Sequence, residues 1–190
     1  NNNSEASRTI GWAFVTARNI SADRVFIFDN SSNPTGETIN RNQFETYFLD
    51  PFKLMLSTYN GTELNYLVTT KGIPLRINGG NNKASFDQEI SLAGGPYEPD
   101  IGEDWWTNHN YGPLAGKQME EFTRDEYGFF LVTRLTGYTV DTALDLIEKA
   151  NNSYGSRGTH ILDLATNRNE TGYKFWNDDL YVANTTLNGT

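Results

Sequence analysis

Asp87 and Glu89 are the first residues in this sequence whose types and spacing suggest chemistry. On an extended segment, residues two apart point to the same face, so the two carboxylates would lie side by side. Such a pair can bind a hard cation such as Ca²⁺, or it can share general acid and base work. The third interpretation, which we favour, is a structural ion pair with Arg76 or Arg134.

Lys71 and Arg134 extend this pair to a charged set that a hydrolase could use. Lys71 follows two threonines and precedes a glycine, but no glycine-rich phosphate loop surrounds it. Zinc is not expected, because the chain has no cysteine and no histidine pair at ligand spacing. His109 and His160 stand alone, and no G-x-S-x-G motif supports a serine nucleophile. We therefore expect no bound cofactor, with Ca²⁺ as the one alternative.

The strand that would carry this set runs over residues 64–70 and ends at Lys71, before Gly72 and Pro74. A short apolar run with β-branched and aromatic residues, closed by glycine and proline, is typical of a buried strand. In an open α/β sheet, ligands bind beyond the carboxyl ends of the strands, which is where Lys71 lies. Further strands are predicted at residues 24–28, 127–134 and 159–164. Their continuous apolar character indicates a sheet covered on both faces.

Helices are predicted between these strands. They run from Ser4 or Ser7 to about residue 17, from Asn40 to about residue 59, over 139–150 and over 172–182. Asn40 and Gln43 form a capping pair at the start of the second helix. Pro51 within that helix predicts a kink, or a new start with Asp50 as the cap.

Strands that alternate with helices predict right-handed βαβ units and a mainly parallel sheet. We therefore expect one α/β domain over residues 1–190, built in three layers with helices on both faces of the sheet, Rossmann-like or caspase-like. Residues 94–126 form a long insertion within it. Because a helix comes first, we expect this segment to be part of a larger chain. We also expect a strand from outside it to lie beside residues 24–28 or 64–70, supplied from upstream or donated by a neighbouring subunit.

Composition narrows the class of partner. The formal charge of −9 argues against nucleic acid, whose phosphates need Lys and Arg. No apolar run is long enough to span a bilayer. The expected partners are therefore other copies of the same chain or other surface proteins.

Asparagine is unusually frequent and often stands in Asn-x-Ser/Thr sequons, which mark surface positions in secreted proteins. One interpretation is that Asn-rich loops produce these patterns incidentally. The favoured interpretation is an exported glycoprotein that carries N-linked glycans. The sequons are at Asn2, Asn19, Asn30, Asn60, Asn151, Asn169, Asn184 and Asn188.

Trp105, Trp106 and Tyr111 give the insertion an aromatic cluster. Exposed aromatic side chains suit a protein interface or a sugar-binding platform. The remaining alternative is that this loop folds back on the core. We treat the three residues as candidate interface residues.

Three ordered motifs resemble a family of secreted bacterial and archaeal α/β proteins of uncharacterised function: TTKGIPLRI at 69–77, SFDQEISLA at 85–93 and LVTRLTGYTVDTALDLIEKA at 131–150. Family members show KGIPLRI-like, SVDSEL-like and LVTRLDGPT-like motifs in this order. RTIGWAFVTARNISADRVF at 8–26 is also similar to the family's opening helix and second strand. The family pattern has Val, Ser and Pro where this chain has Phe86, Gln88 and Tyr138. The resemblance implies an exported α/β fold with a strand ahead of the first helix, and it implies no particular reaction.

These features predict an extracellular, glycosylated cell-surface or filament-type module that serves structure and interaction without catalytic activity. The alternative is an exported hydrolase with a site built from Lys71, Asp87, Glu89 and Arg134 at the strand carboxyl ends. Geometry separates the two. A hydrolase needs these four side chains to converge on an open pocket, whereas a structural role needs them to pair beneath a covered surface.

Overall fold

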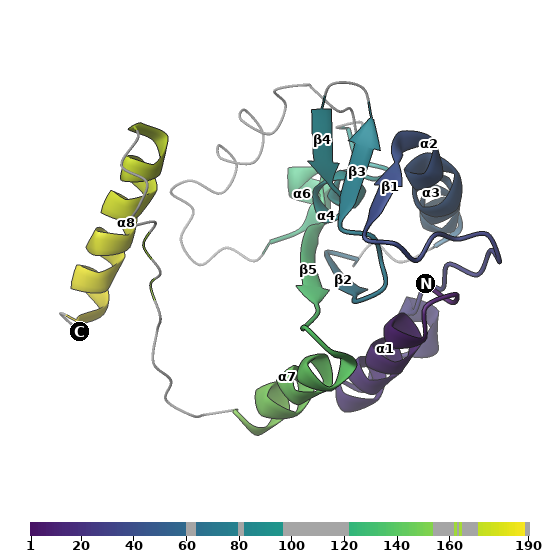
Figure 1. Cartoon of the computed structure of the whole chain (residues 1–190), viewed down its shortest axis with the longest axis horizontal. Helices are drawn as coiled ribbons and strands as arrows, with labels where there is room; N and C mark the ends of the chain where they lie inside the picture. The colour runs from purple at the N-terminus through teal and green to yellow at the C-terminus, as the bar shows by residue number, and fades with distance from the viewer. Residues whose placement is uncertain are drawn as a thin grey trace. The chain divides into compact units, whose positions relative to one another are not determined.

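The computed structural model describes residues 1–59, 64–79, 82–96, 122–153, 162, 164 and 171–188. The chain divides into two compact units, Asn1–Asn152 and Ser153–Thr190 (Figure 1). The second unit contains α8 (Thr171–Asn188), which confirms the helix predicted over 172–182 and extends it. The strand predicted at 159–164 lies outside the described residues, except Leu162 and Leu164, as does most of the insertion at 94–126.

The first unit is a mixed α/β structure, as predicted, with two small sheets in its described part. One sheet has the order β1-β3-β4, with β1 parallel to β3 and β3 antiparallel to β4. The other pairs β2 with β5 in parallel, from Tyr66 opposite Leu131 to Thr70 opposite Leu135. The strands are β1 (Thr38–Asn40), β2 (Tyr66–Thr70), β3 (Arg76–Gly79), β4 (Asn82–Ser85) and β5 (Leu131–Leu135).

The predicted helices at the two ends of this unit are confirmed, and they pack against each other through Ile10, Ala143 and Ile147 (Figure 1). Ser4 caps the first helix by accepting a hydrogen bond from the Ser7 backbone N–H, at 3.2 Å. The described helices of the unit are α1 (Glu5–Ala17), α2 (Arg41–Phe44), α3 (Asp50–Thr58), α4 (Phe86–Ser91), α6 (Arg124–Tyr127) and α7 (Val140–Asn152).

The second predicted helix forms without a break at Pro51. Asn40 and Gln43 make the predicted capping box, and α2 continues through a π-helical turn (η2, Glu45–Leu49) into α3. Asp50 lies inside the helix and does not cap it, because the preceding Leu49 already has helical backbone angles. Proline lacks an N–H and its ring clashes with the carbonyl four residues back. The wider π turn immediately before Pro51 accommodates both effects.

Residues 24–28 do not form the predicted strand. A short 3₁₀ turn (η1, Ala22–Arg24) comes first, and the chain then continues without pairing to a described strand. Val25 nevertheless has extended backbone angles (φ −105°, ψ 106°), and Phe26 and Phe28 pack against the main core. The apolar pattern therefore predicted correctly that Phe26 and Phe28 pack against the core, where they are half-buried. It predicted the strand pairing wrongly, because pairing needs a neighbour that local sequence does not specify.

The segment that carries the two carboxylates is a helix, α4, and not the extended chain assumed above. Side chains two apart on a helix do not face each other. The expectation that Asp87 and Glu89 share one face is therefore wrong. Ser85 before the first helical residue, and acidic residues in the first turn, are the sequence signals that favour a helix here.

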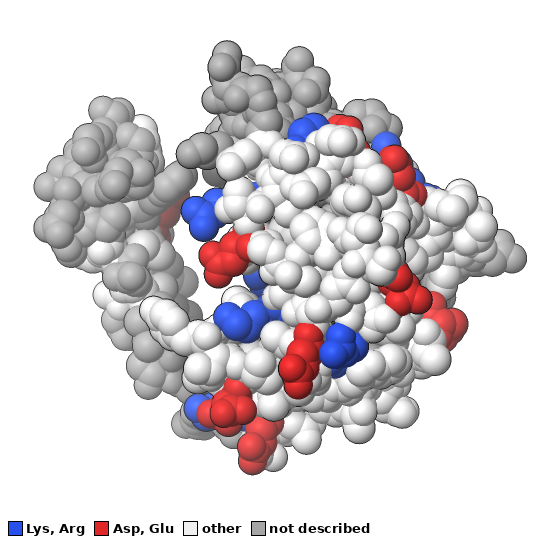
Figure 2. Space-filling view, turned by 45° about the vertical axis from the view of Figure 1, so that its right-hand side comes forward, with Lys and Arg blue, Asp and Glu red and all other residues white. Residues whose placement is uncertain are grey.

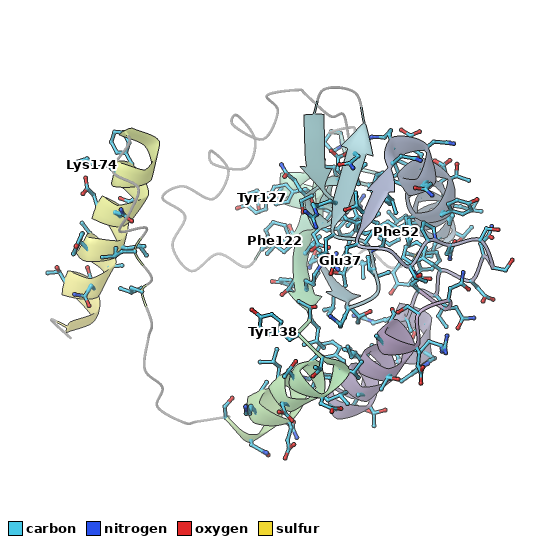
Figure 3. The ribbon with its side chains drawn as sticks, viewed as in Figure 1. Glu37, Phe52, Phe122, Tyr127, Tyr138 and Lys174 are labelled. Atoms are coloured by element: carbon cyan, nitrogen blue, oxygen red, sulfur yellow. The ribbon has the colours of Figure 1, made fainter. Side chains whose placement is uncertain are left out.

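The main core lies between the helices and the sheets and is rich in phenylalanine. Phe86 receives the rings of Phe44 and Phe48 edge-on, with ring centroids 5.3 and 5.1 Å away. Figure 3 shows Phe52 within this cluster, whereas Tyr138 points away from it. A second cluster contains Phe122, Tyr127 and Phe129 beside Leu92. The buried residues of the main core are Ile39, Phe44, Phe48, Leu49, Phe52, Ile73, Ile77, Phe86, Ile90, Ala93 and Phe130.

Candidate functional site

Arg134 and Asp87 form the closest ion pair between separate elements of the described fold. Arg134 lies on β5, and its Nε and Nη2 donate to the two carboxylate oxygens of Asp87 on α4, at 2.7 and 2.6 Å. Nη1 and Nη2 also donate to the backbone carbonyls of Ile73 and Pro74, each at 2.9 Å. The Thr69 hydroxyl donates to Asp87 at 3.0 Å. Both charged side chains are thus committed to partners within the fold.

Glu89 turns to the other side of α4 and pairs with a different cation. Its Oε2 accepts from Arg41 Nη1 at 3.0 Å, and Glu89 is only 3% exposed. Lys71 is separate again, because its Nζ donates to the Gly137 carbonyl at 3.0 Å. The four residues predicted as a site are therefore distributed over three contacts and do not converge on one pocket.

A metal site gains no support from this geometry. Asp87 and Glu89 are held by separate arginines, whose charges already balance them. Among the residues that the structure describes, no group of three or more His, Cys, Asp or Glu side chains is arranged to hold a metal ion. Binding of Ca²⁺ by this pair stays a prediction from sequence alone.

The glycosylation candidates are at the surface wherever they can be placed. Five sequon asparagines are exposed: Asn2, Asn19, Asn30, Asn151 and Asn184. Asn60 and Asn169 lie outside the described residues, and Asn188 ends α8 with its side chain outside them. The candidate interface residues Trp105, Trp106 and Tyr111, with His109 and His160, also lie outside the described part.

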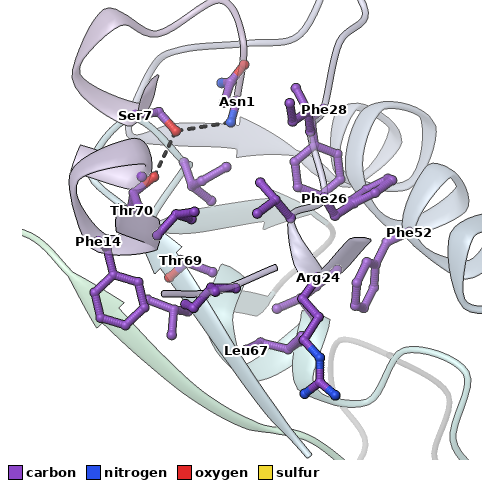
Figure 4. A pocket seen from close by; sticks show the side chains of 18 of the residues that line it. Asn1, Ser7, Phe14, Arg24, Phe26, Phe28, Phe52, Leu67, Thr69 and Thr70 are labelled. Atoms are coloured by element: carbon purple, nitrogen blue, oxygen red, sulfur yellow. Dashed lines mark hydrogen bonds between the residues drawn. The ribbon is translucent and has the colours of Figure 1, made fainter. Parts of the chain in front are cut away.

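A pocket in the described part of this unit is mostly apolar and has a different location from the charged set. Its volume is about 480 Å³, and it lies between β2 on one side and residues 24–28 on the other (Figure 4). Helix α1 contributes Phe14 and Val15, and the main core contributes Phe52 and Phe86. We call this pocket the slot. The apolar run at 24–28 was the sequence signal for it, since Phe26 and Phe28 pack against the core while no described strand pairs with residues 25–28.

Asn1 lies at one end of the slot. Its α-ammonium donates to Ser7 Oγ at 3.0 Å, and Ser7 Oγ is 2.8 Å from Thr70 Oγ1 at the carboxyl end of β2 (Figure 4). The Asn1 side chain donates to the Gly72 and Pro34 carbonyls. Burial, with repulsion from Arg8 as the smaller cause, lowers the pKa of this amine from 8.0 to about 6.

Replacing Arg134 by Lys should destabilise the fold by roughly 2–3 kcal/mol, because an ammonium cannot make the bidentate contact and also reach two carbonyls. The matched control is Arg76→Lys. Arg76 pairs with Glu37 at 3.6 Å, both side chains are at least 60% exposed, and such pairs contribute only about 0–1 kcal/mol. Denaturant unfolding of the two variants checks this. Equal losses in both would contradict a structural role for the Arg134–Asp87 pair.

In the 190-residue chain prepared with a free amino group at Asn1, this buried amine should make stability depend on pH. Between pH 6 and 8 the unfolded chain binds more protons than the folded one, so stability should rise with pH in this window, by roughly 2–3 kcal/mol. Below pH 6 the full penalty is present, and above pH 8 it is absent. Thermal unfolding from pH 5.5 to 8.5 measures the rise. An Nα-acetylated chain should lose most of this rise, and an unchanged rise would assign it to other groups.

Comparisons with known proteins give no family for this chain. It matches no protein-family model, no curated protein sequence and no solved structure. The interpretation of its function therefore follows from its own sequence and geometry.

Proposed function

We propose that this chain is an extracellular cell-surface module, of the kind found in surface layers or filaments, that serves structure and interaction and performs no catalysis. One observation carries the proposal. The four charged side chains that a hydrolase would use at the strand ends, Lys71, Asp87, Glu89 and Arg134, are engaged in contacts that hold the fold together. The hydrolase alternative would require these contacts to break before substrate could reach the charges.

The described surface supports an interaction role over binding to a strongly charged partner. In the face shown in Figure 2, acidic and basic side chains are interspersed, and a broad area between them carries no charge. The described helices include none that is both long and apolar enough to cross a bilayer. The exposed sequons support export, because N-linked glycans are added only to accessible asparagines of secreted chains.

The finer fold in this proposal is a three-layer α/β domain with a mainly parallel sheet. The parallel pairs β1–β3 and β2–β5, and the packing of α1 and α7 on each other next to β2, support it. The resemblance to secreted bacterial and archaeal α/β proteins points the same way. In this view the insertion at 94–126 supplies the contact with other copies of the chain or with other surface proteins.

Native protein should carry N-linked glycans, and Asn30 is the best-placed candidate. Asn30 is exposed, and its side-chain oxygen accepts from the Ser32 backbone N–H at 2.9 Å, which presents the sequon on a turn. Intact mass before and after enzymatic deglycosylation measures occupancy, and Asn30→Gln should remove one glycan mass. Asn33→Gln is unsuitable as a control because Asn33 is buried, so Asn42→Gln, exposed and outside any sequon, serves instead. An unmodified native mass would contradict export as a glycoprotein.

Replacing Trp105 and Trp106 together by alanine should weaken self-association while the melting temperature stays within a few degrees of the parent. The reason is that aromatic side chains at an interface contribute much of the binding energy. Sedimentation velocity over a concentration series measures the association. Tyr138→Ala, a fully exposed aromatic residue outside the slot, is the control. Loss of folding in the double variant would place these rings in a core and remove the interface role.

A further inference from the structure

The slot has the outline of a missing strand. β2 borders one edge and residues 24–28 border the other, while helix α1 covers one face and the main core covers the opposite face (Figure 4). The lining is mostly apolar, and several large apolar side chains around it are exposed: Trp12, Ile27, Tyr66 and Val68. A space with two strand-like edges and two apolar faces matches a β-strand flanked by neighbours in the middle of a sheet.

The edge of β2 that faces the slot offers backbone hydrogen bonds. Asn65 O accepts from Leu131 N, and Lys71 N donates to Leu135 O, so the odd-numbered residues of this segment face β5. Successive residues of a strand direct their backbone groups to opposite edges. Tyr66 and Val68 therefore direct theirs into the slot, where no described strand pairs with them. An unpaired strand edge favours the addition of another strand.

The other edge shows how that strand would run. Asn2 N–H donates to Phe28 O at 2.9 Å, and the Asn1 side chain donates to Gly72 O at 3.0 Å. Asn1 and Asn2 thus bridge the carboxyl end of the 24–28 segment and the carboxyl end of β2. They occupy the position that the last residues of an inserted strand parallel to β2 would occupy.

We propose that the slot is the seat of an extended apolar β-strand of the same polypeptide, parallel to β2 and joined to Asn1 at its carboxyl end. A strand of roughly five residues matches the length of β2 and fills the slot. A strand joined here replaces the desolvated α-ammonium by an uncharged peptide nitrogen, so a buried charge is removed. The side chains that the slot receives are apolar, in keeping with Phe14, Phe52 and Phe86 in its walls.

With this strand in place the separate pieces become one sheet. Its order is residues 24–28, the inserted strand, β2 and β5, and in chain order this is second, first, third and fourth. That order is the one used by doubly wound α/β sheets, with α1 as the crossover between the first two strands. The inference goes beyond the proposed function and does not depend on it, since a strand in the slot is compatible with either a structural module or an enzyme.

The experiment compares extensions of the 190-residue chain. One form carries five β-branched apolar residues joined to Asn1, and a second carries five Gly and Ser residues. A third arm adds the apolar peptide to the unextended chain as a separate molecule. Amide hydrogen exchange at Tyr66 and Val68 reports pairing at the slot edge, and the melting temperature reports stability. We expect the joined apolar strand to slow exchange at these two amides at least roughly tenfold and to raise Tm by at least roughly 5 °C over the Gly/Ser form.

Gly11 provides an internal control. It lines the slot, and a Cβ built on it meets nothing within 4 Å, so a larger side chain can start from this position, and Gly11→Phe is chosen to place a ring in the slot. In the unextended chain this variant should fold and keep or raise its Tm. In the chain with the apolar extension it should abolish the slowed exchange, because ring and strand compete for one space. Thr9→Phe, exposed on the same helix and outside the slot, should leave the slowed exchange intact.

Two results would overturn the proposal. Equal exchange at Tyr66 and Val68 with the apolar and the Gly/Ser extensions would mean that the slot does not accept a strand. Equal protection by the separate peptide at micromolar concentration would mean that the slot serves a strand donated by another molecule. Glycan occupancy and self-association are measured independently, so failure of the proposed function would leave this inference unaffected.

Discussion

The contact on which the first unit most depends is the seating of the Arg134 guanidinium. It joins β5 to Asp87 at the start of α4 and to the carbonyls of Ile73 and Pro74 in the turn that follows β2. Three segments far apart in the sequence thus meet at one planar group with several fixed donors. The side chain is only 11% exposed, so an unpaired charge at this place would be costly. Any function assigned to the charged residues at the strand ends must therefore be compatible with this structural role.

The first unit pairs charged side chains inside the fold and leaves several apolar side chains exposed. The charges at the strand ends are neutralised inside the fold, whereas apolar side chains such as Tyr66 and Val68 remain exposed on one face of β2. In most domains the reverse holds, since buried surface is apolar and functional groups are displayed. Exposed apolar surface next to an unpaired strand edge is a mark of an unfilled interface. Among the described residues, the unit therefore lacks packing and strand-pairing partners at the slot, whereas the charged set has its partners within the fold.

The sequence predicted the locally determined elements well. The capping residues Ser4 and Asn40, and the apolar stripe of α7, act over a few residues, and the corresponding helices are confirmed. It failed where the outcome depends on distant partners. Phe86 and Ile90 stand four apart with three polar residues between them, which suits a helix, but the segment is short, and the packing of Phe86 against Phe44 and Phe48 is a contact that local sequence does not specify. Asp87 and Glu89 are separated because they lie on that helix. The prediction of the candidate site therefore depended on the predicted secondary structure of this segment, and it failed when that prediction failed.

The π-helical turn at Glu45–Leu49 has a consequence for how this protein can change in evolution. Phe44, Phe48 and Phe52 stand four residues apart, a spacing that drifts around an ordinary α-helix. The extra residue in the turn corrects that drift and keeps all three rings on the core side. Loss of a single residue there would shift the helical phase by about 100° and rotate one end of the aromatic row away from Phe86 and Phe130. Length variation among related chains should therefore be confined to loops and spare this segment, even where its exposed residues diverge.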